Sequence, residues 1–139
     1  MPLPEGVYLY ENGVPKRAER LELPDGPTLI FFDNVNCPYC RIFDVLWDAM
    51  VEDRELRSLN FARVVCTYFE SNCGDPGSKK AFGEFKVKRS PFVVLALKNP
   101  EGTKLVELPP SKFNYDYVAM KKAILKALEE HEQQRVEER

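Results

Sequence analysis

Two cysteines separated by two residues, Cys37 and Cys40, are the part of the sequence best suited to chemistry. They follow the apolar run Leu29–Phe32, and apolar residues recur at helical spacing after them. A Cys-x-x-Cys pair between a buried strand and a helix is typical of a dithiol that exchanges with disulfides. Unpaired N–H groups and the positive end of the helix dipole favour the thiolate of Cys37. We expect Cys40 to be more buried and to resolve a mixed disulfide by attacking Cys37.

The same two cysteines could instead form a closed, inert disulfide or one half of a metal site. Structural zinc needs four ligands, and here Cys66 and Cys73 would have to supply the other two. Cys66 falls inside an expected strand, and the spacing from Cys66 to Cys73 is wider than in common zinc sites. We therefore expect no metal and no cofactor apart from the redox-active disulfide. Zinc binding through the four cysteines is kept as the third functional hypothesis.

Cys66 and Cys73 allow three interpretations of their own. They are two unrelated cysteines, or a structural disulfide that restrains the loop Glu70–Ser78, or a second redox couple that passes electrons to Cys37 and Cys40. The carboxyl ends of parallel strands meet at one edge of a sheet, which makes proximity of the two pairs plausible. We expect Cys66→Ser to leave turnover nearly unchanged, whereas a relay predicts that turnover is lost.

The rest of the chain supplies the elements that would position these cysteines. The expected strands are Val7–Tyr10, Thr28–Phe32, Asn60–Phe69, Phe92–Leu97 and Lys104–Leu108, and the expected helices are Pro38–Leu59, Lys79–Phe85 and Tyr115–Glu130. Strands separated by helices imply parallel neighbours, and the last two strands form an antiparallel hairpin. This order predicts an α/β fold, with a mixed central sheet and helices on both faces.

Length and composition set the wider limits. A chain of 139 residues with 44% hydrophobic residues predicts one globular domain. Within it, residues 1–27 form an N-terminal extension with a short strand, and residues 131–139 form a charged tail. Pro15 and the charges around it indicate that any strand paired beyond the Asn12-Gly13 turn is an edge strand.

Charge and hydropathy exclude several classes of partner. Twenty basic and 22 acidic residues give a net charge of −2, which provides no electrostatic basis for binding nucleic acid or an anionic membrane. The apolar runs are too short to cross a membrane, and the N-terminus lacks the features of a secretory signal. We therefore expect a soluble, cytoplasmic, monomeric protein.

These features resemble the thioredoxin superfamily across residues Thr28–Glu130. The sequence CPYC at Cys37–Cys40 is the form familiar from glutaredoxins, and KVKRSPFVVL at Lys86–Leu95 resembles the segment in which a cis proline begins a strand beside the dithiol. The resemblance implies a thioredoxin-like fold. It also implies that Ser90 and Pro91 lie against the active cysteines and contact the substrate backbone.

Other positions match the family only in part. By the resemblance, Tyr39 is exposed and helps to shape the substrate surface. Thioredoxins have an aromatic residue where Asn36 stands and a buried acid where Phe31 stands. Asp33, two positions later on the same strand face, is a candidate proton acceptor in place of that acid. The glycine pair of glutaredoxins is replaced by Pro109-Pro110-Ser111, which leaves the electron donor open between glutathione and a reductase.

The sequence therefore predicts a thiol–disulfide oxidoreductase that acts on protein disulfides through Cys37 and Cys40, with an unidentified reductase or thiol donor. The alternative is a non-catalytic thioredoxin-like module that binds a partner around Pro91 with its disulfide closed. Whether the enzyme works as reductase, oxidase or isomerase is left open. Of the neighbouring side chains, we expect Arg41 to point to solvent and Trp47 to serve packing.

Overall fold

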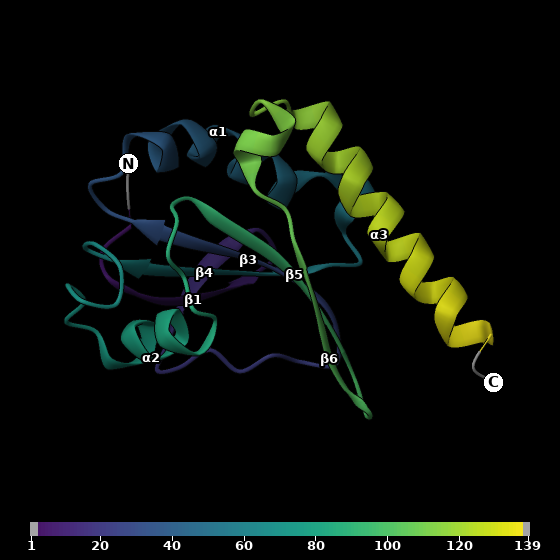
Figure 1. The fold of residues 1–139 in the computed structure, drawn as a ribbon, viewed down its shortest axis with the longest axis horizontal. Helices are drawn as coiled ribbons and strands as arrows, with labels where there is room; N and C mark the ends of the chain where they lie inside the picture. The colour runs from purple at the N-terminus through teal and green to yellow at the C-terminus, as the bar shows by residue number, and fades with distance from the viewer. Residues whose placement is uncertain (1–2, 138–139) are drawn as a thin grey trace.

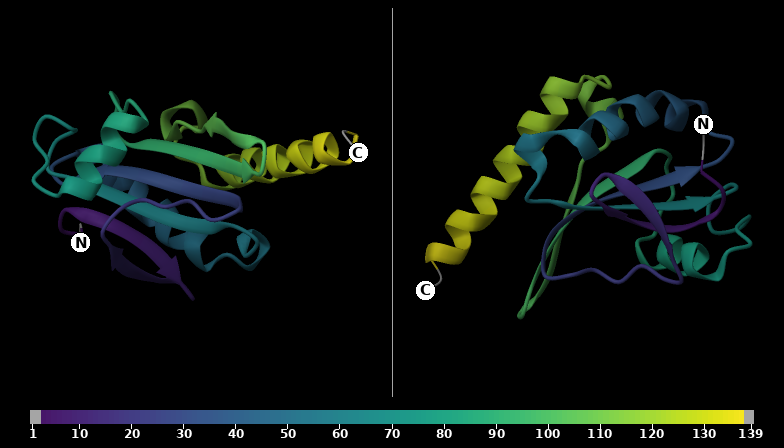
Figure 2. Two further views of the ribbon diagram at one scale, coloured as in Figure 1. Left: turned by 90° about the horizontal axis from the view of Figure 1, so that it is seen from below. Right: turned by 180° about the vertical axis from the view of Figure 1, so that it is seen from behind.

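The computed structural model describes residues 3–137 and shows a six-stranded mixed sheet with helices on both faces (Figure 1). Helices α1 and α3 cover one face and α2 covers the other, as the further views in Figure 2 also show. The predicted α/β class with a mixed central sheet is confirmed. The helices are α1 (Pro38–Glu52), α2 (Pro76–Glu84) and α3 (Tyr117–Glu137), with two short 3-10 helices, η1 (Arg54–Leu56) and η2 (Pro110–Phe113).

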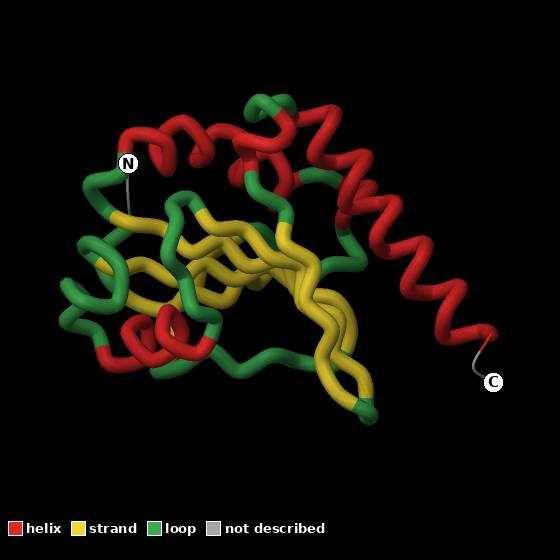
Figure 3. The backbone as a smooth tube through the Cα atoms, viewed as in Figure 1, coloured by secondary structure: helices red, strands yellow, loops and turns green. Residues whose placement is uncertain are grey.

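The strands lie in the order β2-β1-β4-β3-β5-β6. Only β3 and β4 pair in parallel among the described strands, and the other neighbours are antiparallel. Figure 3 shows that the far end of the β5–β6 hairpin extends beyond the rest of the sheet. The bounds are β1 (Gly6–Glu11), β2 (Val14–Ala18), β3 (Gly26–Asn34), β4 (Asn60–Cys66), β5 (Phe92–Asn99) and β6 (Gly102–Glu107).

Strand β5 runs antiparallel to β3, so the expectation that strands separated by helices are parallel is wrong for this strand. The segment between β4 and β5 starts and finishes at the same edge of the sheet. Cys66, at the end of β4, lies beside Asn34, and Phe92, at the start of β5, lies beside Phe32. Because α2 does not carry the chain back to the opposite edge, β5 enters the sheet in the reverse direction.

The N-terminal extension is more ordered than expected, because it forms a complete β-hairpin. Asn12 and Gly13 both have positive φ, at 51° and 79°, which suits a tight two-residue hairpin turn. Strand β2 is an edge strand, as predicted. Strand β1 is internal, since it pairs with β2 on one side and with β4 on the other.

Several predicted boundaries are wrong at the ends of elements. Helix α1 stops at Glu52 and not near Leu59, because Asp53 has extended backbone and its carboxylate accepts the N–H of Glu55 to begin η1. Strand β4 ends at Cys66, three residues before the expected end, where the chain turns into the loop that leads to α2.

The other two helices also differ from their expected bounds. Helix α2 begins at Pro76 and not at Lys79, because Asp75 is its N-cap and accepts the backbone N–H of Ser78 at 2.9 Å. Helix α3 begins two residues later than expected, after Tyr115 in the left-handed region. It continues through the charged segment to Glu137, so the described part of the expected tail is helical.

Strand β3 supplies side chains to two separate cores, because successive residues of a strand face opposite sides of the sheet. Leu29 and Phe31 pack beneath α1 and α3, whereas Ile30 and Phe32 pack against α2. The packing role predicted for Trp47 is confirmed, since its side chain is fully buried in the first core. Because β3 is packed on both faces, its carboxyl end is held in place, and the chain passes from that end to Cys37.

Candidate active site

Cys37 is the N-cap residue of α1, with extended backbone at φ −93° and ψ 114°. Pro38 takes the first helical position, where its missing N–H would have had no partner in the helix. The sulfur of Cys37 accepts a hydrogen bond from the backbone N–H of Cys40 at 3.2 Å. Its side chain is only half-buried, and its thiol is free. Negative charge on this sulfur is therefore stabilised by an N–H group and by the helix dipole, while the sulfur stays accessible.

Cys40 has a free thiol but an entirely different environment, because it is fully buried. Its sulfur lies 2.8 Å from the hydroxyl oxygen of Ser90. The peptide bond between Ser90 and the buried Pro91 is cis, as the resemblance implied. Burial raises the pKa of the Cys40 thiol, the hydrogen bond with Cys37 raises it further, and the Ser90 hydroxyl acts in the opposite direction. Cys40 is therefore a neutral thiol at pH 7 while Cys37 is also reduced.

Tyr39 lies between the two cysteines in sequence and projects outward, with 58% of its surface exposed, as predicted. Its ring stacks on Tyr115, with ring centroids 6.0 Å apart and an interplanar angle of 23°. Both rings line a cavity of about 450 Å³ that Ser90 and Pro91 also line. The structure thus brings together five predicted site residues: Cys37, Cys40, Ser90, Pro91 and Tyr39.

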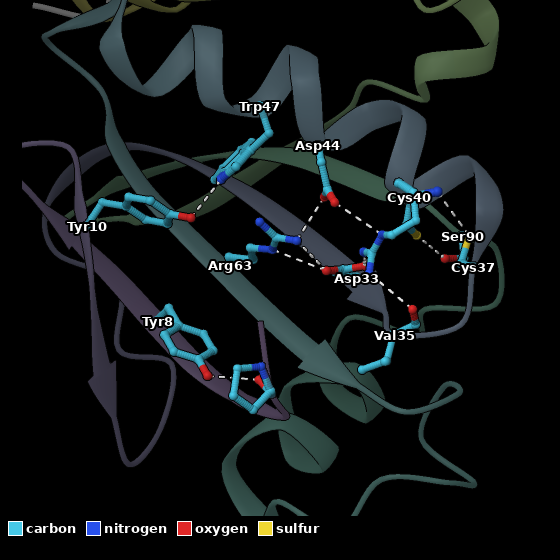
Figure 4. A network of polar contacts seen from close by, with 12 residues as sticks. Tyr8, Tyr10, Asp33, Val35, Cys37, Cys40, Asp44, Trp47, Arg63 and Ser90 are labelled. Carbon is cyan, nitrogen blue, oxygen red and sulfur yellow. Dashed lines mark hydrogen bonds and ion pairs between the residues drawn. The ribbon is translucent and has the colours of Figure 1, made fainter. Parts of the chain in front are cut away.

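Asp33 is fully buried beneath the start of α1, within a network of four charged side chains (Figure 4). Arg63 donates to Asp33 Oδ2 at 2.6 Å and to Asp44 Oδ1 at 2.8 Å. Arg41 pairs with the other oxygen of Asp33, so both carboxylate oxygens are bound to guanidinium groups. The negative charge of Asp33 adds to the effects that raise the pKa of Cys40. A role as proton acceptor stays a prediction.

Arg41 does not point to solvent, so that expectation is wrong. Its guanidinium pairs with Asp33 and Asp44 and also donates to the carbonyl oxygen of Val35 at 3.0 Å. Two carboxylates in a poorly solvated site attract the cation inward, because each would otherwise be a buried charge without a partner. Arg41 therefore ties the first turn of α1 to the segment that leads into Cys37.

Two features of the sequence point weakly to this network. Arg63 interrupts an apolar strand, Asn60–Cys66, and a charge in the middle of a buried strand requires a partner. Asp44 follows Arg41 by three residues and so lies on the same side of α1. No sequence pattern indicated that Tyr115 belongs to the site, because its contact with Tyr39 depends on how the loop after β6 folds back.

Cys66 and Cys73 form a disulfide, so the interpretation as two unrelated cysteines is wrong. Cys66 is fully buried at the end of β4, and its carbonyl oxygen accepts the N–H of Val35 at 3.0 Å. The loop that the disulfide closes also contacts the end of β3, since Phe69 donates its N–H to the side-chain oxygen of Asn34 at 2.7 Å. The disulfide loop therefore lies against the segment before Cys37. A relay of electrons between the two pairs stays a hypothesis.

Glu5 holds the same loop from the N-terminal side. Its carboxylate accepts hydrogen bonds from the N–H and the hydroxyl of Thr67, and from the N–H groups of Gly74 and Asp75. The hydrogen bond from the Thr67 hydroxyl is the largest influence on the pKa of Glu5, which lies below its ordinary value. The disulfide loop is thus fixed both covalently and by one ionised side chain.

The four-cysteine zinc hypothesis is incompatible with this arrangement, because two of the four sulfurs are bonded to each other. Between residues 3 and 137, no cluster of three or more His, Cys, Asp or Glu side chains is placed to hold a metal ion.

Comparison of the chain with family models, curated proteins and solved structures gave no match. The interpretation of the site therefore depends on its own geometry. Of the helices formed by residues 3–137, none has the length and apolar character needed to cross a membrane.

Proposed function

We propose that this protein is a thiol–disulfide oxidoreductase that exchanges disulfides with protein substrates through Cys37 and Cys40. The observation that carries the proposal is the inequality of the two free thiols at the start of α1. Cys37 is accessible and accepts an N–H hydrogen bond, whereas Cys40 is buried against Ser90. An attacking thiol needs access and a stabilised thiolate, and a resolving thiol needs only to reach its neighbour.

In the reductive direction, the thiolate of Cys37 attacks one sulfur of a substrate disulfide. A mixed disulfide forms, and the other substrate sulfur leaves as a thiolate. Cys40 then loses its proton and attacks the sulfur of Cys37, which releases the second substrate thiolate. Two electrons pass to the substrate, and the protein is left with a Cys37–Cys40 disulfide. The Ser90 hydroxyl, at 2.8 Å, can donate a hydrogen bond to the Cys40 sulfur as it loses its proton.

The arrangement of elements supports a thioredoxin-like fold for the region from β3 onward. Its order is β3-α1-β4-α2-β5-β6-α3, and a cis proline precedes β5 beside the dithiol. The β1–β2 hairpin adds two strands to this unit. An external reductase or thiol donor, a cytoplasmic location and a monomeric state complete the proposal.

Reduction of insulin by dithiothreitol tests the proposal. The wild-type protein is expected to accelerate the reaction, and Cys37→Ser is expected to lose that acceleration because the attacking sulfur is absent. Cys40→Ser is the matched variant: in a parallel reaction without dithiothreitol, the pre-reduced variant is expected to form a mixed disulfide with insulin that it cannot resolve, detectable by non-reducing electrophoresis. An equal rate for the wild-type protein and Cys37→Ser would overturn the proposal and favour a non-catalytic binding module.

A further inference from the structure

The cavity beside the dithiol is large enough for one bulky side chain. Its volume is about 450 Å³, within the range of small-molecule sites in proteins. The surface that lines it is mostly apolar and combines three aromatic residues, Phe92 among them, with three prolines. The lining residues that matter here are Tyr39, Arg89, Pro91, Pro109, Pro110 and Tyr115.

The cavity lies beside the reactive cysteines, although neither cysteine lines it. Ser90, which contacts the sulfur of Cys40, also lines the cavity, and so does Tyr39, which lies between the two cysteines. A substrate whose sulfur is bonded to Cys37 therefore has the neighbouring residues of its own chain beside this cavity. The covalent bond brings such a residue to the cavity at no further cost in translational freedom.

The aromatic wall of the cavity is held in place by an unusual backbone. Tyr115 has φ 54°, a left-handed conformation that a bulky residue rarely adopts. Its N–H donates to the carbonyl oxygen of Pro110 at 3.0 Å, which fixes the loop. This conformation places the ring of Tyr115 on that of Tyr39, so the two rings offer an aromatic surface. Aromatic side chains bind well to such a surface, by stacking or by edge-to-face contact.

The cavity offers fewer charged groups than recognition of glutathione requires. Arg89 is the one charged residue among the described residues that line it, and its guanidinium lies 3.6 Å from the carboxylate of Glu107. Glutathione carries two carboxylates, and recognition of each calls for a cation or a set of N–H donors. The chemistry of the lining therefore favours an uncharged, apolar group.

We propose that this cavity selects protein disulfides in which a large apolar residue, above all an aromatic one, lies next to the reactive cysteine. This inference rests on the proposed oxidoreductase function and names its substrate class. The side chain enters the cavity against Tyr39 and Tyr115 while the substrate sulfur is attacked by Cys37. Glutathione disulfide is a poor substrate by the same argument.

Single-turnover reduction of small peptide disulfides tests the selectivity. The substrates are symmetric disulfides of capped tetrapeptides that differ only in the residue after cysteine, which is phenylalanine, leucine, glycine or aspartate, together with glutathione disulfide. The pre-reduced wild-type protein is mixed with each substrate, the reaction is stopped with acid, and the products are separated by chromatography. We expect the phenylalanine peptide to react at least about tenfold faster than the glycine peptide.

Three variants identify the cavity as the source of this preference. Tyr115→Ala is expected to reduce the ratio of phenylalanine to glycine rates toward one. Tyr39→Ala, which removes a largely exposed ring and so carries little risk to folding, is expected to do the same. Tyr68→Ala is the matched control, because Tyr68 is exposed to a similar degree and does not line the cavity. It is expected to keep the wild-type ratio.

The remaining outcomes separate this inference from the function on which it rests. Equal rates for all four peptides, or a fastest reaction with glutathione disulfide, would overturn the selectivity and leave the oxidoreductase activity standing. A preference that survives both Tyr115→Ala and Tyr39→Ala would also overturn it. Failure of the reduced protein to react with any of these disulfides would overturn the proposed function itself.

Discussion

The two cysteine pairs lie at the same edge of the sheet but differ in the properties that govern thiol chemistry. Cys37 and Cys40 are free thiols at the start of a helix, one accessible and one buried. Cys66 and Cys73 are bonded to each other and join the end of a strand to a loop. A helix N-terminus can present one sulfur to a partner protein. Cys66, by contrast, is fully buried at the end of a strand, and its sulfur is bonded to that of Cys73. The two pairs differ in thiol chemistry because of their positions in the fold, more than because of their spacing in the sequence.

The interactions that hold the two cysteine pairs in place also differ. Beneath the dithiol, Asp33 and Asp44 are bound to Arg41 and Arg63 by ion pairs. The disulfide loop is held by its covalent bond and by the hydrogen bonds to Glu5. Ion pairs thus support the free thiols, and a covalent bond supports the loop.

The largest effect is expected from Arg63→Met, which removes the most buried cation of the network. Arg63 has only 4% of its side chain exposed, and its loss leaves Asp33 and Asp44 in a site of low polarity with one fewer partner. Such a change costs about 3–5 kcal/mol of unfolding free energy, which urea denaturation measures. Arg20→Met is the control, because the Arg20–Glu22 pair is exposed and contributes at most about 1 kcal/mol. Equal losses in the two variants would contradict the account of the network.

An intermediate effect is expected from the double variant Cys66→Ser with Cys73→Ser. Opening a disulfide with a sequence separation of 7 lowers the unfolding free energy by about 2–3 kcal/mol, because the unfolded chain gains freedom. Thermal unfolding followed by circular dichroism measures the loss. Insulin reduction by the folded variant is expected to stay within about twofold of the wild-type rate. Loss of turnover in a folded variant would instead support the relay between the two pairs.

The smallest effect concerns pH and Glu5. Hydrogen bonds, first of all from the Thr67 hydroxyl, hold the pKa of Glu5 below its ordinary value of 4.5. A carboxyl group whose pKa is lowered in the folded state stabilises that state above its ordinary pKa, and this stabilisation is lost as the pH falls through the folded value. The unfolding free energy of the wild-type protein is therefore expected to decrease more steeply below about pH 4.5 than that of Glu5→Gln. Parallel pH profiles for the two proteins would contradict this.

Local patterns in the sequence were sufficient to predict the dithiol and most strands. The continuous apolar run of β3 and the proline after Cys37 each depend on a few adjacent residues, and the family resemblance pointed to the Ser90-Pro91 pair before the next apolar strand. The thiols of Cys37 and Cys40 could thus be placed before any tertiary contact was known.

Features that depend on distant contacts were missed. The inward direction of Arg41 depends on its partner Asp33, which lies on β3 and not on the helix that carries Arg41. Helical spacing alone does not show that the two side chains meet. The direction of β5 depends on where the loop after α2 returns to the sheet, which periodicity alone does not reveal. The contact between Tyr39 and Tyr115 joins two segments 76 residues apart, and it became visible only in the folded chain.

The proposed function requires Cys37 and Cys40 to form a redox couple, and we expect Cys66 and Cys73 to stay bonded while that couple changes state. A redox titration in dithiothreitol and glutathione buffers, with alkylation and mass spectrometry of the four cysteines, tests this most directly. We predict that Cys37 and Cys40 change state together as a two-electron couple, at a potential between about −270 and −120 mV. Cys66 and Cys73 are expected to stay bonded throughout that range. Failure of Cys37 and Cys40 to pair in the most oxidising buffer, or a transition of Cys66 and Cys73 in their place, would contradict the account.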